Sequence, residues 1–402
     1  MADVVIAGGG PAGLCAARET AAAGLSTIVV EKGAAIGVPL RTSGGSWIDE
    51  LAALGVPPRF YLPIHRIRVI GPHAEARFDF RAPRMCVLDV RPFYQWLAQR
   101  AADAGAEIRL ETRVDATIGG DGRGVGVRTR ERNGRVDEIA ARVVVDATGY
   151  PSALARRAQL HTGFHAFGIG VELDLYAPRH DPREAILIVG SAVAPCGYAW
   201  AFPYGDRRVR LGVGIGRPHS DADPHAYLDA LRARVPALAA LQGASPIEHH
   251  VGLIPLAAPR SVPLVGDRLV VTGDAAGQAS ALVGEGIRYA MRAGRAAGAA
   301  IVAACRNGGV SAAALEAYPR AWARDERNLR FAHQIYRRIV DYDDAAWDRE
   351  IEQLTRLSAD QFAQGLKGDF TLGWLLAVIP RYAGMLVPER FRLNAHRFAR
   401  EG

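Results

Sequence analysis

Three glycines near the start of the chain are spaced for contact with a phosphate. The apolar run 4–7 ends in Gly8-Gly9-Gly10-Pro11-Ala12-Gly13. In this G-x-G-x-x-G pattern the first glycine permits a tight turn, and the second lets the backbone approach a pyrophosphate. The third lets the following helix pack close to the strand. The unpaired N–H groups at the start of that helix would point at the phosphates, so the loop predicts a dinucleotide-binding site.

The elements that must position this loop follow in order. The sequence predicts a strand over 4–7, an Ala-rich helix from Leu14 to about Ala23, and a second strand over 26–30 that closes with Glu31 and Lys32. A carboxylate at that point can accept hydrogen bonds from a ribose diol. Strand, loop, helix, strand and acid within about 30 residues predict a Rossmann-type fold.

A second glycine-rich segment decides between nucleotides. A strand over 268–272 leads into Gly273-Asp274, and Gly284-Glu285-Gly286-Ile287 opens a helix expected to reach about Cys305. This segment resembles the second FAD fingerprint of the p-hydroxybenzoate hydroxylase superfamily. The resemblance implies that Asp274 binds the FAD ribityl chain. It also implies that the helix directs its positive end at the flavin pyrimidine.

Other segments resemble parts of the same superfamily. The turn at 146–149, which ends in Gly149, has Thr148 where the hydroxylases usually have Asp. A neutral Thr cannot take the carboxylate's part in FAD and NADPH binding, which argues against a standard NADPH-dependent aromatic hydroxylase. The resemblance further implies that Arg91 starts a helix packed by the FAD, and that the backbone of Val114 touches the adenine.

Alternating aromatic residues form a third motif. Tyr198, Trp200 and Phe202 project from one face of a strand because side chains alternate along it. We expect Pro203 to end that strand and 208–213 to be its hairpin partner, with Gly212 and Gly214 leaving open space beside the rings. Rings at a period of two would form a wall for an elongated apolar ligand. The alternative is ordinary aromatic packing in the core of a sheet.

The spacing of this motif is similar to the Y-x-W-x-F-P…G-x-G signature of the geranylgeranyl reductase family, whose members hold a prenyl chain beside FAD. The likeness covers residues 1 to about 310. Many members have Cys-Gly-Gly near the flavin, whereas this chain has Ser43-Gly44-Gly45 after Arg41 and Thr42. A Ser hydroxyl is not a comparable redox or acid group at neutral pH. If the family chemistry uses the Cys, this protein does without it.

The resemblance and the glycine loop together imply two sets of site residues. Those expected at the cofactor are Gly8, Gly10, Pro11, Ala12, Gly13, Glu31, Lys32, Arg41, Ser43, Arg91, Val114, Gly149, Gly273, Asp274, Gly284, Gly286 and Ile287. Those expected at the substrate are Tyr198, Trp200, Phe202, Pro203, Gly212 and Gly214. No catalytic side chain stands out, and Ser43, Gly44 and Gly286 are the candidates near the flavin.

The resemblance implies an FAD-dependent reductase that saturates C=C bonds of a geranylgeranyl, polyprenyl or related isoprenoid substrate by hydride transfer from reduced flavin. FAD would be noncovalent. The sequence shows no second nucleotide fold, so NAD(P)H binds transiently or a ferredoxin or reductase supplies electrons. Two alternatives stay open: an FAD-dependent monooxygenase of an aromatic or polyketide substrate, and a non-redox FAD- and isoprenoid-binding or cyclase-like protein.

Length and composition fit this interpretation. The chain has 402 residues, 49% of them hydrophobic and 23% charged, which is a folded globular balance with room for two or three domains. We expect an α/β, p-hydroxybenzoate hydroxylase-like fold, in which a Rossmann-type FAD-binding domain is interleaved with an antiparallel-sheet substrate domain. The expected segments are 1–75, 106–165 and 265–310 for FAD, 76–105 and 166–264 for substrate, and 311–402 as a C-terminal helical region.

The distribution of charge, cysteine and histidine limits the classes of partner and ligand. The net charge of +7 is spread along the chain, which argues against binding to nucleic acid. The basic residues are almost all Arg, which is typical of a GC-rich bacterial genome. Four scattered cysteines favour a reduced cytoplasmic setting without disulfides or zinc. His161, His165 and the pair His249-His250, expected half exposed, predict no metal site. The longest apolar run, 370–379, predicts a packed helix and at most peripheral membrane contact. The family resemblance implies a role in bacterial secondary metabolism or lipid biosynthesis.

Overall fold

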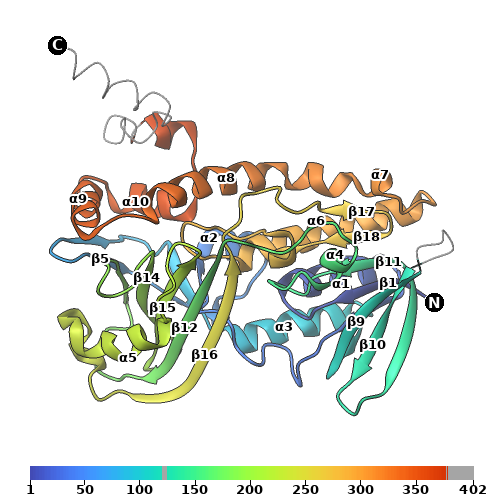
Figure 1. Ribbon diagram of the computed structural model, residues 1–402, viewed down its shortest axis with the longest axis horizontal. Coiled ribbons are helices and arrows are strands. Elements are labelled where there is room, and N and C mark those ends of the chain that lie inside the picture. Colours follow the sequence, from blue (N-terminus) through green and yellow to red (C-terminus); the bar gives the residue numbers. More distant parts are fainter. Residues whose placement is uncertain (120–124, 377, 379–402) are drawn as a thin grey trace.

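Parallel strands around the glycine loop form the centre of an eight-stranded sheet (Figure 1). The computed structural model describes residues 1–119, 125–376 and 378. The strands of this sheet are β1 (Ala2–Ala7), β2 (Thr27–Val30), β8 (Glu107–Arg109), β9 (Thr112–Gly119), β10 (Val125–Glu131), β11 (Val136–Asp146), β17 (Val265–Gly266) and β18 (Leu269–Val271). β1 lies between β2 and β11, with Val5 opposite Ile28 and Val144. A strand covered on all sides needs a continuous apolar run, and residues 4–7 supply it.

Two helices that are distant in sequence pack directly beneath the glycine loop. They are α1 (Pro11–Ala22) and α6 (Ile287–Arg306). α1 begins three residues before its expected start at Leu14, because Pro11 and Gly13 fit the first turn of a helix, and α6 runs one residue past its expected end. Their backbones approach closely because α6 carries Gly294, where an added Cβ would lie 2.1 Å from the carbonyl oxygen of Ala12. This close approach joins the first flavin motif to the second.

The aromatic motif lies in a second sheet of seven strands, ordered β16-β12-β15-β14-β13-β5-β6. Its strands are β5 (Arg66–Ile70), β6 (Glu75–Asp79), β12 (Phe167–Tyr176), β13 (Glu184–Ile188), β14 (Gly197–Tyr204), β15 (Arg208–Arg217) and β16 (Ser245–Pro255). A small third sheet is formed by β3 (Gly45–Trp47), β4 (Tyr61–Pro63) and β7 (Met85–Leu88). One face of the seven-stranded sheet packs on the apolar side of α5 (Pro224–Arg234), which leaves the aromatic face turned toward the other elements.

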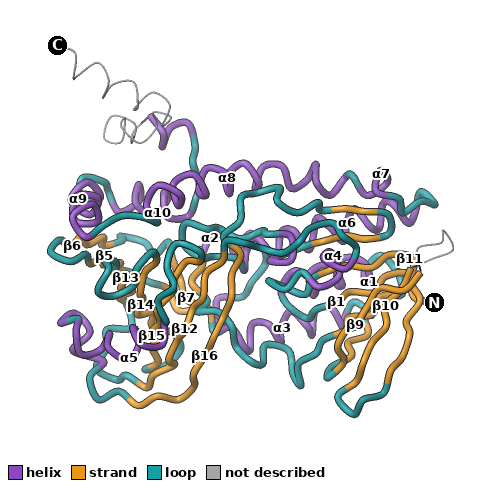
Figure 2. Tube along the Cα trace, viewed as in Figure 1, coloured by secondary structure: helices purple, strands orange, loops and turns teal. Residues whose placement is uncertain are grey.

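Helices at the end of the chain lie across both sheets, as Figures 1 and 2 show along the upper edge. They are α7 (Ala312–Leu315), α8 (Ala317–Ile339), α9 (Asp344–Leu354) and α10 (Ala359–Lys367). The remaining helices are α2 (Ile48–Ala53), α3 (Val90–Asp103), α4 (Ala153–Arg157) and the 3-10 turns η1 (Pro58–Phe60), η2 (Pro236–Leu241) and η3 (Gly273–Ala276). Among the described residues, none of the helices has both the length and the apolarity needed to cross a bilayer.

This arrangement confirms the expected α/β architecture, with a parallel sheet, a largely antiparallel sheet and, in the described part of 311–402, a helical region. Residues 379–402 of that region lie outside the described residues. The division into domains stays a proposal, and sheet membership suggests two adjustments to it. β5 shares the seven-stranded sheet, so the first FAD segment would end before Arg66. α3 packs with α1 in one apolar core, so it would join the FAD domain. Of the apolar run 370–379, residues 377 and 379 lie outside the described residues. The expected packing of this run is only partial: Trp374 packs against α10, whereas Leu372 is 73% and Leu376 63% exposed.

Candidate flavin and substrate site

The glycine loop has the geometry of a phosphate cradle. Gly8 has a φ of +114°, and an added Cβ there would lie 2.2 Å from the carbonyl oxygen of Ala147. At Gly13 an added Cβ would lie 2.1 Å from the carbonyl oxygen of Gly8. At Gly10, the N-cap of α1, no described atom lies within 4 Å of an added Cβ. The first N–H groups of α1 therefore face a space that a phosphate can fill.

Glu31 holds this loop in place. Its carboxylate accepts hydrogen bonds from the backbone N–H of Gly9, at 2.8 Å, and of Gly33, at 2.7 Å. The neighbouring Lys32 and the side chain of Arg113 on β9 line a shallow hollow beyond the loop. Val114, expected at the adenine, lies half-buried on the same strand. The loop, the acid and β9 thus lie in the order that an extended dinucleotide requires.

The second motif meets the first. Gly273, with a φ of +68°, lies so close to α1 that an added Cβ would be 2.9 Å from Cβ of Ala12. Asp274 follows it and lines the large cavity described below, and burial raises the pKa of its carboxyl group to about 6. Gly286 precedes α6, and its missing Cβ leaves room for Asp274, whose Oδ1 would lie 3.1 Å from such an atom. These contacts fit an FAD whose ribityl chain reaches Asp274 and whose flavin lies before α6.

Thr148 closes the turn before Gly149. Its hydroxyl donates a hydrogen bond of 2.6 Å to Oδ1 of the buried Asp146, and its oxygen accepts one of 2.8 Å from the N–H of Ala153. The other oxygen of Asp146 accepts from the N–H groups of Leu154 and Ala155. Asp146 is therefore occupied within the turn, and Thr148 adds no charge to the site.

One cavity of about 1260 Å³ joins the two halves of the site. Its wall includes the start of α1 at Pro11, the segment 41–47, Asp274, the segment 281–287 and the aromatic residues of β14. The second part of the wall comes from α8, α9 and α10. Because single ligand pockets commonly measure 300–1,000 Å³, the space is large enough for a cofactor end and a second molecule beside it.

Ser43 and Gly44 lie in the wall on a loop that a buried arginine supports. Arg210 of β15 donates hydrogen bonds from Nη1 to the carbonyl oxygens of Ser43, at 2.7 Å, and of Leu88, at 2.9 Å. Its guanidinium carbon lies 3.7 Å from the ring centroid of Tyr204. Arg41 passes over β16 at Gly252, where an added Cβ would lie 2.2 Å from its carbonyl oxygen. Sequence reasoning missed Arg210, although a charged residue within the apolar strand β15 was a signal for it.

The aromatic motif differs from expectation in two respects. β14 does not end at Pro203 but continues to Tyr204, because pairing with β13 is confined to 199–201 and asks for no amide hydrogen at Pro203. The glycines of β15 leave no open space, because the indole of Trp200 lies against them. An added Cβ at Gly212 would lie 2.3 Å from Cζ2 of that ring, and one at Gly214 would lie 3.3 Å from Cζ3.

Tyr198 connects the aromatic motif to the flavin loop. Its hydroxyl donates a hydrogen bond of 2.6 Å to the carbonyl oxygen of Val283, beside Gly284. The ring centroids of Tyr198 and Trp200 lie 5.5 Å apart, and those of Trp200 and Phe202 lie 6.3 Å apart. All three side chains line the cavity. Core packing and a ligand wall are thus not exclusive, since the rings pack on the sheet and present a surface to the cavity.

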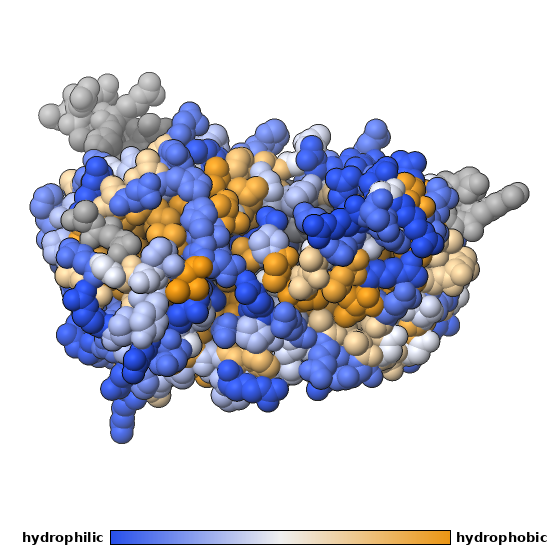
Figure 3. All heavy atoms as spheres, turned by 90° about the horizontal axis from the view of Figure 1, so that it is seen from below, coloured by the Kyte–Doolittle hydropathy of each residue, from blue (hydrophilic) through white to orange (hydrophobic). Residues whose placement is uncertain are grey.

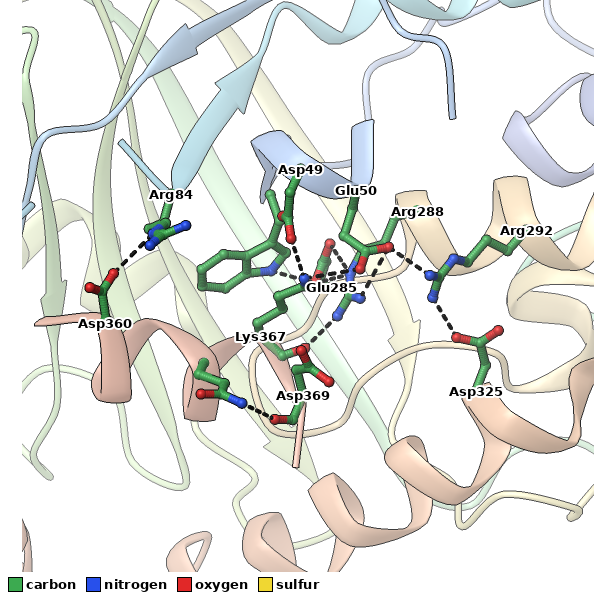
Figure 4. Close-up of polar contacts among 12 residues, drawn as sticks. Asp49, Glu50, Arg84, Glu285, Arg288, Arg292, Asp325, Asp360, Lys367 and Asp369 are labelled. Carbon is green, nitrogen blue, oxygen red and sulfur yellow. Dashed lines mark hydrogen bonds and ion pairs between the residues drawn. The ribbon is translucent and has the colours of Figure 1, made fainter. Parts of the chain in front are cut away.

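Glu285 lies between Gly284 and Gly286 of the loop before α6. It is buried and belongs to a network of ion pairs that Figure 4 shows. Its carboxylate accepts hydrogen bonds from the Trp47 indole, at 3.1 Å, and from Nε of Arg288, at 2.9 Å. Burial raises the pKa of Glu285, although Arg288 and Trp47 act in the opposite direction. The loop that would lie beside the flavin is therefore fixed to α6 and to β3.

The same network reaches the C-terminal helices. Arg288 donates a hydrogen bond to the carbonyl oxygen of Lys367 at the end of α10. The ammonium group of Lys367 lies 2.6 Å from Asp49 and 3.0 Å from Glu50 of α2. Arg292 extends the network from Glu50 to Asp325 of α8. These contacts hold α8 and α10 over the cavity.

A buried histidine was missed by sequence reasoning. We expected the pair His249-His250 half exposed, but only His249 is exposed, whereas the side chain of His250 is 2% exposed. Its Nδ1 lies 3.1 Å from Oε1 of Glu172. Strand alternation could have separated the two histidines, because neighbours on a strand face opposite sides.

Two more carboxylates lie near this histidine. Ligand atoms of Asp174, Glu248 and His250 lie within 4.8 Å of one another. However, Arg91 already binds Glu248 at 2.8 Å, and Arg208 binds Asp174 at 2.8 Å, so both acids are neutralised without a metal ion. Arg91, which was expected to start a helix, is the second residue of α3, and its guanidinium is engaged by Glu248.

Sequence comparison places these features among known proteins. A family model described as lycopene cyclase protein matches residues 3–370. Digeranylgeranylglycerophospholipid reductase 1 of Methanopyrus kandleri is 33% identical over 331 residues, which cover 81% of this chain and 87% of that protein. Digeranylgeranylglycerophospholipid reductase 2 of Methanothermobacter thermautotrophicus is 33% identical over 367 residues, covering 88% and 91%.

Solved structures of flavin-dependent proteins have the same fold as this chain. A geranylgeranyl bacteriochlorophyll reductase-like protein from Thermoplasma acidophilum superposes with a TM-score of 0.83 at 24% identity, covering 96% of this chain and 97% of that one. A triple mutant of a flavin-dependent brominase superposes with a TM-score of 0.72 at 21% identity, covering 95% and 100%. At these identities the likeness establishes a flavoprotein fold and leaves the reaction to the site.

Proposed function

This chain belongs to the geranylgeranyl reductase family of FAD-dependent oxidoreductases, and on that premise we propose that it saturates C=C bonds of an isoprenoid lipid with electrons from bound FAD. The observation that carries the proposal is the single cavity shared by the flavin loops and the aromatic wall. An apolar chain lying against Tyr198, Trp200 and Phe202 would reach the loop 281–287 without leaving the protein. Its alkenes could then be aligned for reduction.

The residues of this chain divide the work of holding the reactants. The cradle at Gly8–Gly13 would bind the pyrophosphate, and Asp274 the ribityl chain. The N-terminus of α6 would place its positive end toward the flavin, where it favours negative charge. When bound and reduced, FAD supplies a hydride. The role of the chain itself is to align the alkene and to exclude water, because an isolated alkene is a poor hydride acceptor.

Two segments of the cavity wall are held in place by hydrogen bonds and would position the substrate between them. Arg210 holds the loop at Ser43, and Tyr198 holds the loop at Val283. Each CH₂ of a prenyl chain buried in the cavity contributes about 0.8 kcal/mol, so binding energy comes from the length of the chain. We therefore propose that an apolar chain, rather than a particular head group, dominates substrate affinity.

The electron donor and the location are part of the proposal. We propose NAD(P)H or a ferredoxin as the donor and a cytoplasmic setting with peripheral membrane contact. The edge strand β16 supports that contact, because Ile247, Val251 and Leu253 are all more than one-third exposed. Figure 3 shows apolar side chains gathered in patches on the underside of the molecule. Flotation with anionic lipid vesicles tests the contact, and loss of flotation in Leu253→Asp is the expected result.

A direct test follows flavin oxidation without oxygen. Holoprotein reduced with dithionite is mixed anaerobically with a geranylgeranyl glycerophospholipid, and the return of oxidised-flavin absorbance is recorded. We expect reoxidation with the prenyl lipid and none with its fully saturated counterpart, which is the matched control. Equal reoxidation by both lipids would contradict the proposal.

The family model named for lycopene cyclase favours one second candidate, a non-redox cyclase-like activity on an isoprenoid. That activity would leave the mass of the substrate unchanged and the flavin reduced. The monooxygenase alternative finds less support, because Thr148 is neutral and bonded within its own turn. It would require oxygen and would add an oxygen atom to the product.

A further inference from the structure

Saturating a C=C bond needs a proton as well as a hydride, and we propose that Glu248, His250 and Glu172 form a path that carries this proton from solvent to the cavity. Glu172 would be the donor to the alkene. The inference rests on the proposed function, and it assigns an acid that the flavin motifs do not contain. It is carried by the geometry of three adjacent strands.

The strand register brings these side chains to one face. Glu172 of β12 lies opposite His250 of β16 on one side and opposite Gly212 of β15 on the other. Gly212 in turn lies opposite Trp200 of β14. Residues that lie directly opposite each other on neighbouring strands point to the same face of the sheet. The carboxylate, the imidazole and the indole therefore all lie on the cavity side.

The contacts are continuous from the surface inward. Glu248 accepts a hydrogen bond of 2.8 Å from Arg91 and is 35% exposed. Its Oε2 lies 3.4 Å from Nε2 of His250, and that nitrogen has no hydrogen-bond partner among the described residues. Nδ1 of His250 lies 3.1 Å from Oε1 of Glu172, whose side chain is 4% exposed. The imidazole therefore bridges a carboxylate near solvent and one in the wall of the cavity.

The inner end of the path lies in the wall of the cavity, in a fixed orientation. Glu172 and His250 both line the cavity. Nε1 of Trp200 donates a hydrogen bond of 2.8 Å to Oε2 of Glu172 and so fixes that oxygen. The other oxygen, Oε1, is the one that faces His250. A proton received there can turn with the hydroxyl group toward a substrate beside Trp200.

The surrounding charges favour a protonated imidazole. His250 faces Glu172 and Asp174 from β12 and Glu248 from its own strand, while Arg208 of β15 pairs with Asp174 and Arg91 of α3 pairs with Glu248. Burial lowers the pKa of His250, but Glu172 and Glu248 together raise it above its ordinary value. The ring therefore keeps a proton to a higher pH than an isolated histidine does.

The transfer balances for each bond that is saturated. The alkene receives a hydride at one carbon, and its π electron pair forms a C–H bond to the proton of Glu172 at the other carbon. The carboxylate left on Glu172 takes a proton from Nδ1 of His250. His250 then keeps only the proton on Nε2, and a turn of the ring presents its bare nitrogen to Glu248, from which it takes a proton that solvent replaces. Each bond therefore consumes one hydride from the reduced cofactor and one proton from water.

A titration tests the path without any substrate. Nitrogen-15 NMR of the histidine side chains in the holoprotein follows the protonation of His250, with His250→Gln used to assign its signals. We expect Glu172→Gln and Glu248→Gln each to lower the pKa of His250. His249→Gln is the control, since His249 projects from the opposite face of β16, and it should leave that pKa unchanged. A His250 pKa that ignores both carboxylates would overturn the path.

A rate measurement tests the role of the path in the reaction. In anaerobic single turnovers with a geranylgeranyl lipid, His250→Gln should slow flavin reoxidation by about 10²-fold, the usual contribution of a positioned acid, with FAD content and lipid affinity unchanged. The half-exposed Glu248→Gln is the variant least able to disturb the fold, and it should flatten the pH dependence of that rate. His250→Gln reacting at the wild-type rate with the wild-type pH profile would reject the path, whereas a silent wild-type protein would reject the proposed function.

Discussion

The indole of Trp200 lies flat across Gly212 of the neighbouring strand, at a distance that leaves no room for a side chain there. The ring packs directly on the backbone of the two glycines of the G-x-G segment. In this position its N–H points along the sheet to Glu172. The motif positions one face of an indole and one carboxylate at the same wall of the cavity.

Replacement of Gly212 by Val should displace this ring. An added Cβ would lie 2.3 Å from the indole, so the ring must leave the sheet, at a cost of about 1–3 kcal/mol in the free energy of unfolding. FAD content should survive while turnover is lost, as flavin absorbance and product assays would show. Gly266→Ala on β17 is the control, because its nearest atoms lie 3.7 Å or more from an added Cβ. Full activity in Gly212→Val would contradict the proposal that Gly212 positions the Trp200 ring.

Two substitutions of Trp200 separate its surface from its hydrogen bond. Trp200→Ala removes a large apolar surface and should weaken lipid binding by about 2–4 kcal/mol with FAD retained. Trp200→Phe keeps a ring but removes the donor to Glu172, so it should lower the rate more than the affinity. Titration with a geranylgeranyl lipid and single-turnover rates measure the two effects. Loss of folding in Trp200→Ala, with no loss of lipid affinity in Trp200→Phe, would favour core packing as the role of the ring.

Gly10→Val should release the flavin. No described atom lies within 4 Å of an added Cβ at Gly10, so a valine is accommodated in the empty protein and would occupy the space proposed for the pyrophosphate. Thermal stability of the apoprotein should stay within about 1 kcal/mol of wild type, because the substitution touches only the open end of α1. Protein-bound flavin is measured by its absorbance after gel filtration. A variant with full FAD occupancy would show that the pyrophosphate binds elsewhere.

Asp274 predicts a pH dependence of the apoprotein. Burial raises its pKa from 3.8 to about 6, so the folded state favours the protonated carboxyl group. The stabilising contribution is complete below the unfolded pKa and is lost as the pH rises through about 6, by about 1–3 kcal/mol in all. Denaturant unfolding at several pH values should show this loss in the wild type and not in Asp274→Asn. Parallel pH profiles for the two proteins would refute it.

Lys367 should matter more than a neighbouring surface ion pair. Its side chain is 12% exposed and pairs with Glu50, which is 13% exposed, so Lys367→Met should destabilise the protein by about 1–3 kcal/mol. Arg84→Gln is the matched control, because the Arg84–Asp360 pair in Figure 4 is more than half exposed on both sides and should change stability by less than about 1 kcal/mol. Thermal unfolding curves compare them. Equal effects would show that the network does not hold α10.

Local sequence patterns predicted the strands and helices around the two glycine loops well. The strand at 4–7, the helix after Gly10 and the helix after Gly286 form where the glycines and apolar runs indicate, because each is specified by residues next to it in the chain. The meeting of Gly273 with Ala12 could be expected only through the resemblance to other flavoproteins. No periodicity within one element reports a contact between residues so far apart.

The substrate half was harder to predict. The aromatic rings were assigned to one face, but the filled space at Gly212 depends on the register of β15, which the sequence does not state. Arg210, Glu172 and His250 were missed for the same reason, since each becomes part of the site through pairing between strands. A charged residue in an apolar strand such as 208–217 was the available signal, because a buried charge requires a partner.

The mass of the anaerobic product tests the central claim most directly. Chemically reduced holoprotein is incubated without oxygen with a geranylgeranyl lipid, and the extracted lipid is analysed by mass spectrometry. We expect products heavier by about 2 Da for each saturated bond, since every step adds one hydride and one proton. A product of unchanged mass would indicate a cyclase-like activity instead. An anaerobic reaction without product, together with a gain of about 16 Da by an aromatic substrate in air with NADPH, would contradict the reductase assignment.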